Sequence, residues 1–320
     1  MSLDYVLITA AHNEEKFIAT TIRSVIAQTV RPRKWVIVSD ASSDGTDHIV
    51  RGYAARHPFI ELHRIREDHP RNFGAQVEAI NFGYEQLRAI PFSFVGNVDA
   101  DVALPPAYYE TLLRRFADRP ALGLAGGFIY EDHGRGFQSR RTNSPHSVAH
   151  ATQVFRRECF DAIGGYLRLE YGGPDWVAEI MARQRGWMVE AFADLVVQHY
   201  RPAGSAGGVV RGWYRQGRMD HSLGTLPLFE LVKCLRRIPE RPFVLGTAAR
   251  IMAFLYSYLI GAPRLVPPDV VHELREEQRR RLRGMIGLHP HPPASPIAHP
   301  AASPAASSSP ALQRNVGLSD

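Results

Sequence analysis

The chain has 320 residues, which is enough for one large domain or two small ones. Hydrophobic residues make up 45% of it and charged residues 22%, as in a globular protein with a sizeable core. The net charge of +6 favours polyanionic ligands or anionic membrane surfaces. No zinc-finger spacing, RNP-like motif or recognition-helix pattern indicates a nucleic-acid partner.

The cysteines and the N-terminal residues indicate the cellular compartment in which the protein is expected. Cys159 and Cys234 give no disulfide framework and are typical of a reducing compartment. A predicted strand begins at Tyr5, without the basic and apolar regions of a cleaved signal peptide. We therefore expect a cytoplasmic protein, either free or attached to the inner face of the cell membrane.

Four predicted strands alternate with helices in the first third of the chain. Each strand is a short apolar run rich in β-formers, as expected of strands buried on both faces. The strands cover residues 5–11, 35–39, 59–65 and 92–98. This alternation predicts an α/β fold, a Rossmann-like and mostly parallel sheet with helices on both faces and right-handed crossovers.

Polar side chains follow three of these strands at the point where each strand ends. Asn13 and Glu14 come after the first strand, Asp40 comes after the second, and Asp99 and Asp101 come after the fourth. Ligands of such sheets bind at the carboxyl ends of the strands. We therefore expect these side chains to line one crevice.

Asp99 and Asp101 form an Asp-x-Asp motif at the end of a buried strand. Buried strands avoid unpaired charges, so two acids there need a cation or a hydrogen-bonding partner. Such a pair can hold a divalent ion against a diphosphate. A solvated turn is the alternative for the motif taken alone, and the acids after the second strand favour the ion site.

The second half of the chain is less regular. It predicts helices at residues 105–117, 159–166 and 175–184, strands at 122–130, 148–155, 187–192 and 195–200, and a mobile polar loop at 131–145. Helices are expected again at 226–238, 243–262 and 270–283, followed from about residue 288 by a Pro/Ala/Ser-rich tail. That tail cannot bury enough apolar surface to offset its ordering entropy, so we expect it to be disordered.

Residues 243–262 form a mostly apolar run that could just span a bilayer. Arg250, Gly246 and Gly261 argue against a membrane span. The segment is expected either to pack on the protein or to lie at a membrane surface, a peripheral contact that the basic residues around it would favour.

Several motifs occur in chain order at suitable element ends: His12-Asn13-Glu14-Glu15, Ser39-Asp40-Ala41-Ser42-Ser43-Asp44-Gly45-Thr46, Asp99-Ala100-Asp101, Gly164-Gly165-Tyr166 and Pro174-Asp175-Trp176. This pattern resembles the family 2 glycosyltransferases over roughly residues 4–200. The resemblance implies a GT-A type fold and inverting transfer from a nucleotide sugar with Mg²⁺ or Mn²⁺. Together with the change of pattern after residue 202, it predicts three parts: a transferase domain at 1–202, a lid loop and helical, membrane-surface segment at 203–286, and the Pro/Ala/Ser-rich tail at 287–320.

The resemblance assigns roles to single residues. Asp40 matches the acid that contacts the nucleobase, and Asp99 matches the acid near the ribose. Asp101 matches the metal-binding acid, and His199 lies where some members place a second metal ligand. Asp175 matches the general base that takes the proton of the acceptor hydroxyl.

Alternatives stay open for several of these residues. Asn13 and Glu14 could contact the nucleotide or cap the next helix. Asp175 could equally be a first-turn acid favoured by the helix dipole, and the family's usual Glu-Asp pair is Pro174-Asp175 here. His199 could be a hydrogen-bonded structural histidine instead of a ligand.

The expected function is the transfer of a single sugar, because the processive motif Gln-x-x-Arg-Trp is not present. The resemblance implies a UDP- or GDP-sugar donor and a saccharide or lipid-linked acceptor, in surface polysaccharide or glycolipid assembly. Two alternatives are a sugar-phosphate nucleotidyltransferase and a non-catalytic nucleotide-sugar-binding protein of the same fold. A nucleotidyltransferase would need a glycine-rich, phosphate-binding turn after its first strand. Residues 10–15 contain no glycine, which argues against this alternative.

Overall fold

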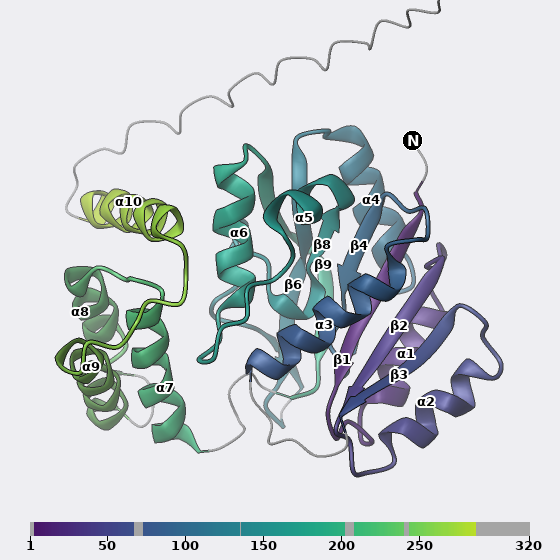
Figure 1. Ribbon diagram of the computed structural model, residues 1–320, viewed down its shortest axis with the longest axis horizontal. Coiled ribbons are helices and arrows are strands. Elements are labelled where there is room, and N and C mark those ends of the chain that lie inside the picture. Colours follow the sequence, from purple (N-terminus) through teal and green to yellow (C-terminus); the bar gives the residue numbers. More distant parts are fainter. Residues whose placement is uncertain (1–2, 67–72, 135, 202–207, 240–242, 286–320) are drawn as a thin grey trace, which may run out of the picture. The chain divides into compact units, whose positions relative to one another are not determined.

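Strand β1 (Tyr5–Ala11) lies inside a nine-stranded sheet, and its first five residues are buried. The computed structural model describes residues 3–66, 73–134, 136–201, 208–239 and 243–285 (Figure 1). The first half contains α1 (Ile18–Ile26), β2 (Lys34–Asp40), α2 (Thr46–Ala54), β3 (Ile60–Arg66), α3 (Phe73–Leu87), β4 (Phe94–Asn97), β5 (Val102–Ala103) and α4 (Tyr108–Asp118). The second half contains β6 (Leu122–Asp132), β7 (Phe137–Ser139), η1 (His150–Thr152), β8 (Val154–Arg156), α5 (Arg157–Ile163), α6 (Pro174–Gln184) and β9 (Met188–His199).

The sheet has the order β3-β2-β1-β4-β8-β6-β9-β5, and β7 pairs with β6. Strands β3, β2, β1 and β4 are parallel, as the alternation of strands and helices predicts. Strand β8 runs antiparallel to both β4 and β6, so the sheet is mixed. The predicted α/β class with a mostly parallel core is confirmed.

The sheet separates two apolar cores. Val6 and Ile8 of β1 face the core formed with α3, α5 and α6, and α3 crosses the front of the sheet in Figure 1. Tyr5 and Leu7 face the opposite core, formed with α1, α2 and α4. Alternate residues of one strand thus enter different cores, as the period of a strand requires. The central strands of the sheet are therefore packed against apolar side chains on both faces.

The expected mobile loop at residues 131–145 is wrong in part. Strand β6 continues to Asp132 and pairs with β7, so the segment begins as a β-hairpin. Asn143 then holds the chain against the strand, since its side chain accepts a hydrogen bond from the Ile129 nitrogen (3.1 Å) and donates one to the Ile129 oxygen (2.8 Å). The polar composition of the hairpin residues predicted a loop, although they pair as two antiparallel strands.

Other boundaries also differ from the sequence prediction. The strand expected at 148–155 is a 3-10 turn, η1, followed by the short β8. The two strands expected at 187–192 and 195–200 are one strand, β9, whose pairing with β6 shifts register between Gly127 and Phe128. Helix α5 ends as predicted at glycine, because Gly164 adopts a φ of 74°.

The described C-terminal part consists of helices α7 (Val209–Ser222), α8 (Pro227–Arg236), α9 (Val244–Leu259) and α10 (Pro268–Met285). Leu223, Val270 and Leu274 of this part belong to the same core as α6. Among the described residues, none of the helices combines the length and the apolar character needed to cross a membrane. The tail that the composition predicts to be disordered lies outside the described residues.

Candidate active site

The carboxyl ends of β2, β1 and β4 meet at one edge of the sheet, because β1 pairs in parallel with both neighbours. Asp40 is the last residue of β2, Glu14 follows β1, and Asp99 follows β4. Glu14 and Asp40 are buried. The structure therefore places these acids on the same edge of the sheet, as the sequence predicts.

The loops after β1 and β2 are tied to each other. Asn13 and Ala41 have φ angles of 56° and 55°, which non-glycine residues seldom adopt. The Asn13 side-chain oxygen accepts a hydrogen bond from the Ser43 nitrogen (2.8 Å), and the Asn13 nitrogen donates one to the Ser42 hydroxyl (3.2 Å). Asn13 thus shapes the loop after Asp40, and its contact with a nucleotide stays a prediction.

The side chains of Asn13 and Glu14 do not cap helix α1, which was the alternative role left open by the sequence. Helix α1 begins after Phe17, and no side chain caps its first turn. The backbone oxygen of Glu14 accepts the hydrogen bonds from Phe17 and Ile18 instead (2.9 Å each). The Glu14 carboxylate lies at the sheet edge, where it pairs with Arg201.

Asp99, Asp101 and His199 form a group of three metal-type ligands. The short strand β5 pairs antiparallel with β9, which places Val102 opposite His199 and brings His199 beside Asp101. The Nε2 atom of His199 lies 3.1 Å from Oδ1 of Asp101. One ligand atom from each of the three residues lies within 4.8 Å of the others. Residues 98 positions apart in the sequence thus lie within contact distance, and their role as metal ligands stays a prediction.

Arg201 completes this cluster, and the sequence analysis missed it. Its Nε donates a hydrogen bond to Oδ2 of Asp101 (3.0 Å), and its Nη2 donates one to Glu14. Arg201 follows His199 by two residues, and alternation along an extended segment puts such residues on the same side. That spacing was the available signal, but a single arginine after a strand is common.

Neighbouring charged groups shift the pKa values of the side chains in this cluster. Burial alone would lower the pKa of His199, but Asp101 raises it above its usual value. Burial alone would raise the pKa of Asp99, but the hydrogen bond with His150 holds it below its usual value. Burial would likewise lower the pKa of Arg201, but Glu14 and Asp101 raise it. The carboxylate of Asp99 is thus held in its charged form by the neighbouring imidazole of His150.

His150 is a second residue that the sequence analysis missed. Its Nδ1 lies 3.3 Å from Oδ1 of Asp99, and the Asn97 side-chain nitrogen donates a hydrogen bond to its backbone oxygen (2.6 Å). The η1 turn presents His150 to Asp99, and that turn replaced an expected strand. An alternating strand pattern gave no reason to single out this histidine.

Asp175 lies in the first turn of α6 and is half-buried. Gln153 links this turn to the Asp99 side of the site, because it contacts the Asp175 backbone oxygen (3.4 Å) and accepts a hydrogen bond from the Tyr166 hydroxyl (2.6 Å). The Tyr166 ring lies 5.3 Å from the His150 ring. Burial would lower the pKa of His150, but Asp99 raises it above its usual value, and the charge of Asp175 adds to that effect.

A divalent cation fits the donor set of Asp99, Asp101 and His199. Carboxylate oxygens and an imidazole nitrogen are ligands that suit Mg²⁺ or Mn²⁺. The guanidinium of Arg201 already places a positive charge against Asp101, as expected where carboxylates converge. Among the described residues, the buried Nδ1 of His199 has no hydrogen-bond partner. Asp99 lies within reach of the same ion, so the ribose role implied for it and a ligand role are both compatible with its place.

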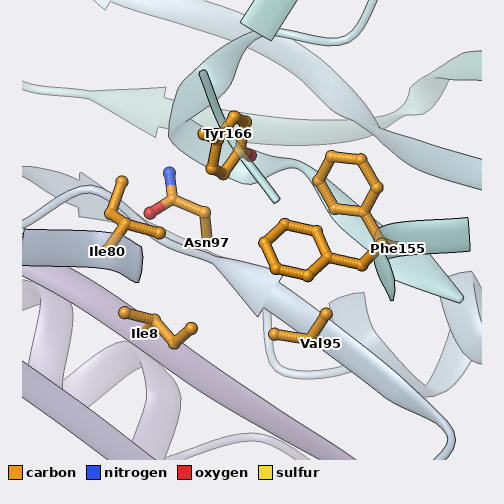
Figure 2. A pocket seen from close by; sticks show the side chains of 7 residues that line it. Ile8, Ile80, Val95, Asn97, Phe155 and Tyr166 are labelled. Atoms are coloured by element: carbon orange, nitrogen blue, oxygen red, sulfur yellow. The ribbon is translucent and has the colours of Figure 1, made fainter. Parts of the chain in front are cut away.

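An apolar hollow lies beside this cluster and is shown in Figure 2. It is lined by Ile8, Ile80, Val95, Asn97, Phe155, Phe160 and Tyr166. Two of these residues, Asn97 and Tyr166, also contact His150 or the residues around it. The hollow is too small for a water molecule, so it belongs to the core that supports the site and is not a ligand pocket.

Similar proteins were found by sequence and by structure. Over 94 residues the chain is 35% identical to the uncharacterized glycosyltransferase YibD of Escherichia coli (strain K12), a match that covers 29% of this chain and 25% of YibD. The chain thus matches about a quarter of the length of that relative.

Two solved structures share the fold. The mannosyltransferase PcManGT from Pyrobaculum calidifontis, in complex with GDP-Man and Mn²⁺, aligns with a TM-score of 0.51 at 18% identity, covering 89% of this chain and 83% of that one. S. aureus TarS 1-349, in complex with UDP, aligns with a TM-score of 0.50 at 15% identity, covering 89% and 79%. At these identities the likeness concerns the fold, and it confirms the predicted GT-A type.

The family model described as glycosyl transferase family 2 matches residues 6–169. This match covers β1 to the end of α5, and includes the loops with Asp40 and the Asp99–Asp101 motif. It covers half of the chain, and the motifs that carry the resemblance in the sequence lie in it or directly after it. The chain belongs to the glycosyl transferase family 2.

Proposed function

We propose that this protein is an inverting, metal-dependent transferase that moves one sugar from a nucleoside-diphosphate sugar to an acceptor hydroxyl. The observation that carries the proposal is the group of Asp99, Asp101 and His199, whose ligand atoms lie within 4.8 Å of one another at the carboxyl edge of the sheet. The transferase chemistry is assigned to residues 1–202, which include every residue of this group.

Each side chain of the crevice has a proposed role. Asp101 and His199 would hold the ion together with Asp99, which also lies where the ribose is expected. A bound Mg²⁺ or Mn²⁺ would stabilise the charge that develops on the diphosphate as the glycosidic bond breaks. Asp40, together with the loop that Asn13 shapes, would contact the base of the nucleotide, and Glu14 would keep Arg201 beside the diphosphate.

Asp175 is the proposed base. Inverting transfer needs one base that takes the acceptor proton while the acceptor oxygen attacks the anomeric carbon from the face opposite the leaving group. Asp175 is half-buried in the first turn of α6, and its backbone is linked through Gln153 to Tyr166. Its alternative role as an acid that stabilises the helix dipole would leave transfer unchanged when the charge is removed.

The donor is proposed to be a UDP- or GDP-sugar, since PcManGT was solved with GDP-Man and Mn²⁺ and TarS with UDP. The acceptor is proposed to be a saccharide or a lipid-linked sugar of surface polysaccharide or glycolipid assembly. Transfer of a single sugar is proposed because the processive motif is not present in the sequence. Membership of the glycosyl transferase family disfavours the nucleotidyltransferase alternative.

The test is a transfer assay with Mn²⁺, UDP- and GDP-sugars and a panel of saccharide and glycolipid acceptors. It measures released nucleoside diphosphate and, by NMR, the anomeric configuration of the product. The account expects an inverted product and no turnover after chelation of the metal. A retained configuration would overturn the inverting mechanism, and donor binding without turnover across the panel would support the non-catalytic alternative.

Asp175→Asn separates binding from chemistry in this assay. The variant is expected to bind the donor as the wild type does and to lose at least about a hundredfold in transfer rate, because general-base catalysis contributes that much or more. Asp118→Asn is the matched control, since Asp118 is an exposed acid at the end of α4. Unchanged transfer in Asp175→Asn would mean that the base lies elsewhere.

A further inference from the structure

Helix α9 buries Phe254 but exposes most of its other large apolar side chains to solvent. Leu245, Met252, Leu255 and Leu259 recur at helical spacing and are 57–84% exposed. The opposite side of the helix, which packs against α7 and α8, contains Thr247, Arg250 and Ser257, all buried. A surface helix normally buries its apolar stripe and exposes its polar one.

Helix α8 extends this apolar surface. Leu228, Leu231 and Leu235 lie at positions i, i+3 and i+7 and are 46–61% exposed. Of the eighteen large apolar residues that are exposed in the described part of the chain, thirteen lie between residues 228 and 260. Single exposed apolar residues are common, but such a concentration marks an interaction surface.

Buried charges hold the two helices in this orientation. Arg250 of α9 donates a hydrogen bond to Glu230 of α8 (2.6 Å) and another to Asp220 of α7, and Lys233 pairs with Asp220 (2.7 Å). Arg250 is 2% exposed. Figure 1 shows α7, α8 and α9 next to one another. Turning α9 to bury its leucines would expose or separate this ion cluster, so the outward apolar stripe is part of the fold.

The charge of this segment indicates the partner. Residues 208–285 contain fourteen lysines and arginines but seven aspartates and glutamates, a surplus of seven positive charges in a chain whose net charge is +6. Arg236, at the end of α8, and Arg264, after α9, are both exposed beside the leucine-rich helices. The rest of the chain is therefore close to neutral.

We propose that the exposed apolar face of α8 and α9 docks on an anionic lipid bilayer. The leucines would enter the acyl boundary, and the arginines would contact lipid phosphates, as amphipathic helices in the membrane interface do. Helix α9 has 16 residues and does not qualify as a membrane span, so it lies in the plane of the interface. A second copy of the chain fits this face less well, because a two-fold interface would bring two positive segments together.

The test is flotation of the full chain with vesicles of phosphatidylcholine alone or mixed with phosphatidylglycerol. Binding is expected only to the mixed vesicles and is expected to weaken in high salt. The variant Leu245→Gln/Leu255→Gln/Leu259→Gln is expected to bind about tenfold or more weakly. Since these side chains are exposed, the variant is expected to fold. Met188→Gln, at an exposed apolar residue of β9, is the control.

Two further variants make the outcome decisive. Arg236→Glu/Arg264→Glu is expected to weaken binding to the anionic vesicles and to leave folding intact. Asp101→Asn is expected to bind vesicles as the wild type does, so vesicle binding is separate from sugar transfer. Equal flotation of the wild type and the leucine variant would overturn the proposal. So would a wild type that ignores vesicles but forms dimers that the leucine variant loses in analytical ultracentrifugation.

Discussion

Arg201 is the residue that most changes how the candidate site is understood, because its guanidinium lies between Asp101 and Glu14. Its positive charge compensates the negative charges of Asp101, a predicted metal ligand, and of Glu14, a predicted nucleotide contact. A divalent ion bound to Asp101 would also compensate part of this negative charge. Arg201 and the ion are therefore expected to stabilise the same cluster.

Arg201→Gln tests this interpretation. Removing the positive charge next to two buried carboxylates is expected to cost about 1–3 kcal/mol of folding free energy without metal. The melting temperature should fall by several degrees. Mn²⁺ should raise the melting temperature of the variant more than that of the wild type, because the ion replaces the missing charge. Arg283→Gln, at an exposed arginine of α10, serves as control, and an equal Mn²⁺ effect in all three proteins would contradict the account.

Glu179 of α6 gives a prediction about pH. Burial raises its pKa to about 8, against the lowering effect of Arg183, while its Oε1 accepts a hydrogen bond from the Val148 nitrogen (2.7 Å). The folded protein therefore keeps a proton on Glu179 that the unfolded chain releases above about pH 4.5. Stability from this proton is fully present below that pH and is lost as the pH rises toward about 8.

Glu179→Gln removes this dependence. Between about pH 5 and 8, the free energy of unfolding of the wild type should fall relative to the variant by about 1.4 kcal/mol per pH unit. Urea unfolding at a series of pH values measures the difference. Parallel pH profiles for the two proteins would mean that Glu179 titrates alike in the folded and unfolded states.

The sequence predicted the candidate metal ligands but not the side chains that contact them. The Asp-x-Asp motif and the parallel strands predicted Asp99 and Asp101 at the sheet edge, and the family resemblance alone placed His199 near them. Ligand atoms of these three residues lie within 4.8 Å of one another in the structure. His150 and Arg201 were missed, since each depends on a long-range contact that leaves no local pattern.

At the scale of elements, the prediction succeeded where strands alternate with helices and failed where strands pair antiparallel. The parallel pairing of β1 with β2 and β4 agrees with the continuous apolar runs in the sequence, which are typical of strands buried on both faces. The hairpin of β6 and β7 pairs mostly polar residues, and β8 pairs with β6 at only two positions, Leu124 with Phe155 and Ala125 with Val154. Those contacts are not readable from hydrophobic periodicity.

The orientation of α9 yields a prediction for the ion cluster beneath it. Arg250→Met removes the cation that contacts Asp220 and Glu230, which are 1% and 2% exposed. Removing one partner of a buried ion cluster is expected to cost about 3–5 kcal/mol. Urea denaturation of this variant and of Arg279→Met, at an exposed arginine of α10, measures the effect. Equal stability of the two variants would show that the cluster does not hold α9.

At the scale of the whole molecule, two functions are proposed for different parts of the chain. The acids at the sheet edge lie within residues 1–202, and the surplus positive charge lies in residues 208–285. The family match ends at residue 169, so the helices from α7 onward lie beyond it. The fold class could be predicted from the first hundred residues, whereas the outward leucines of α9 required the structure.

The most direct test of the central claim is calorimetric titration of UDP and GDP into the protein with and without Mn²⁺. The account predicts that one nucleotide binds the wild type and Asp118→Asn in the presence of Mn²⁺, and that binding weakens at least about tenfold in Asp101→Asn. Asp175→Asn should bind that nucleotide like the wild type. Tight binding that is the same in Asp101→Asn, or unaffected by Mn²⁺, would contradict the metal-assisted nucleotide-sugar site.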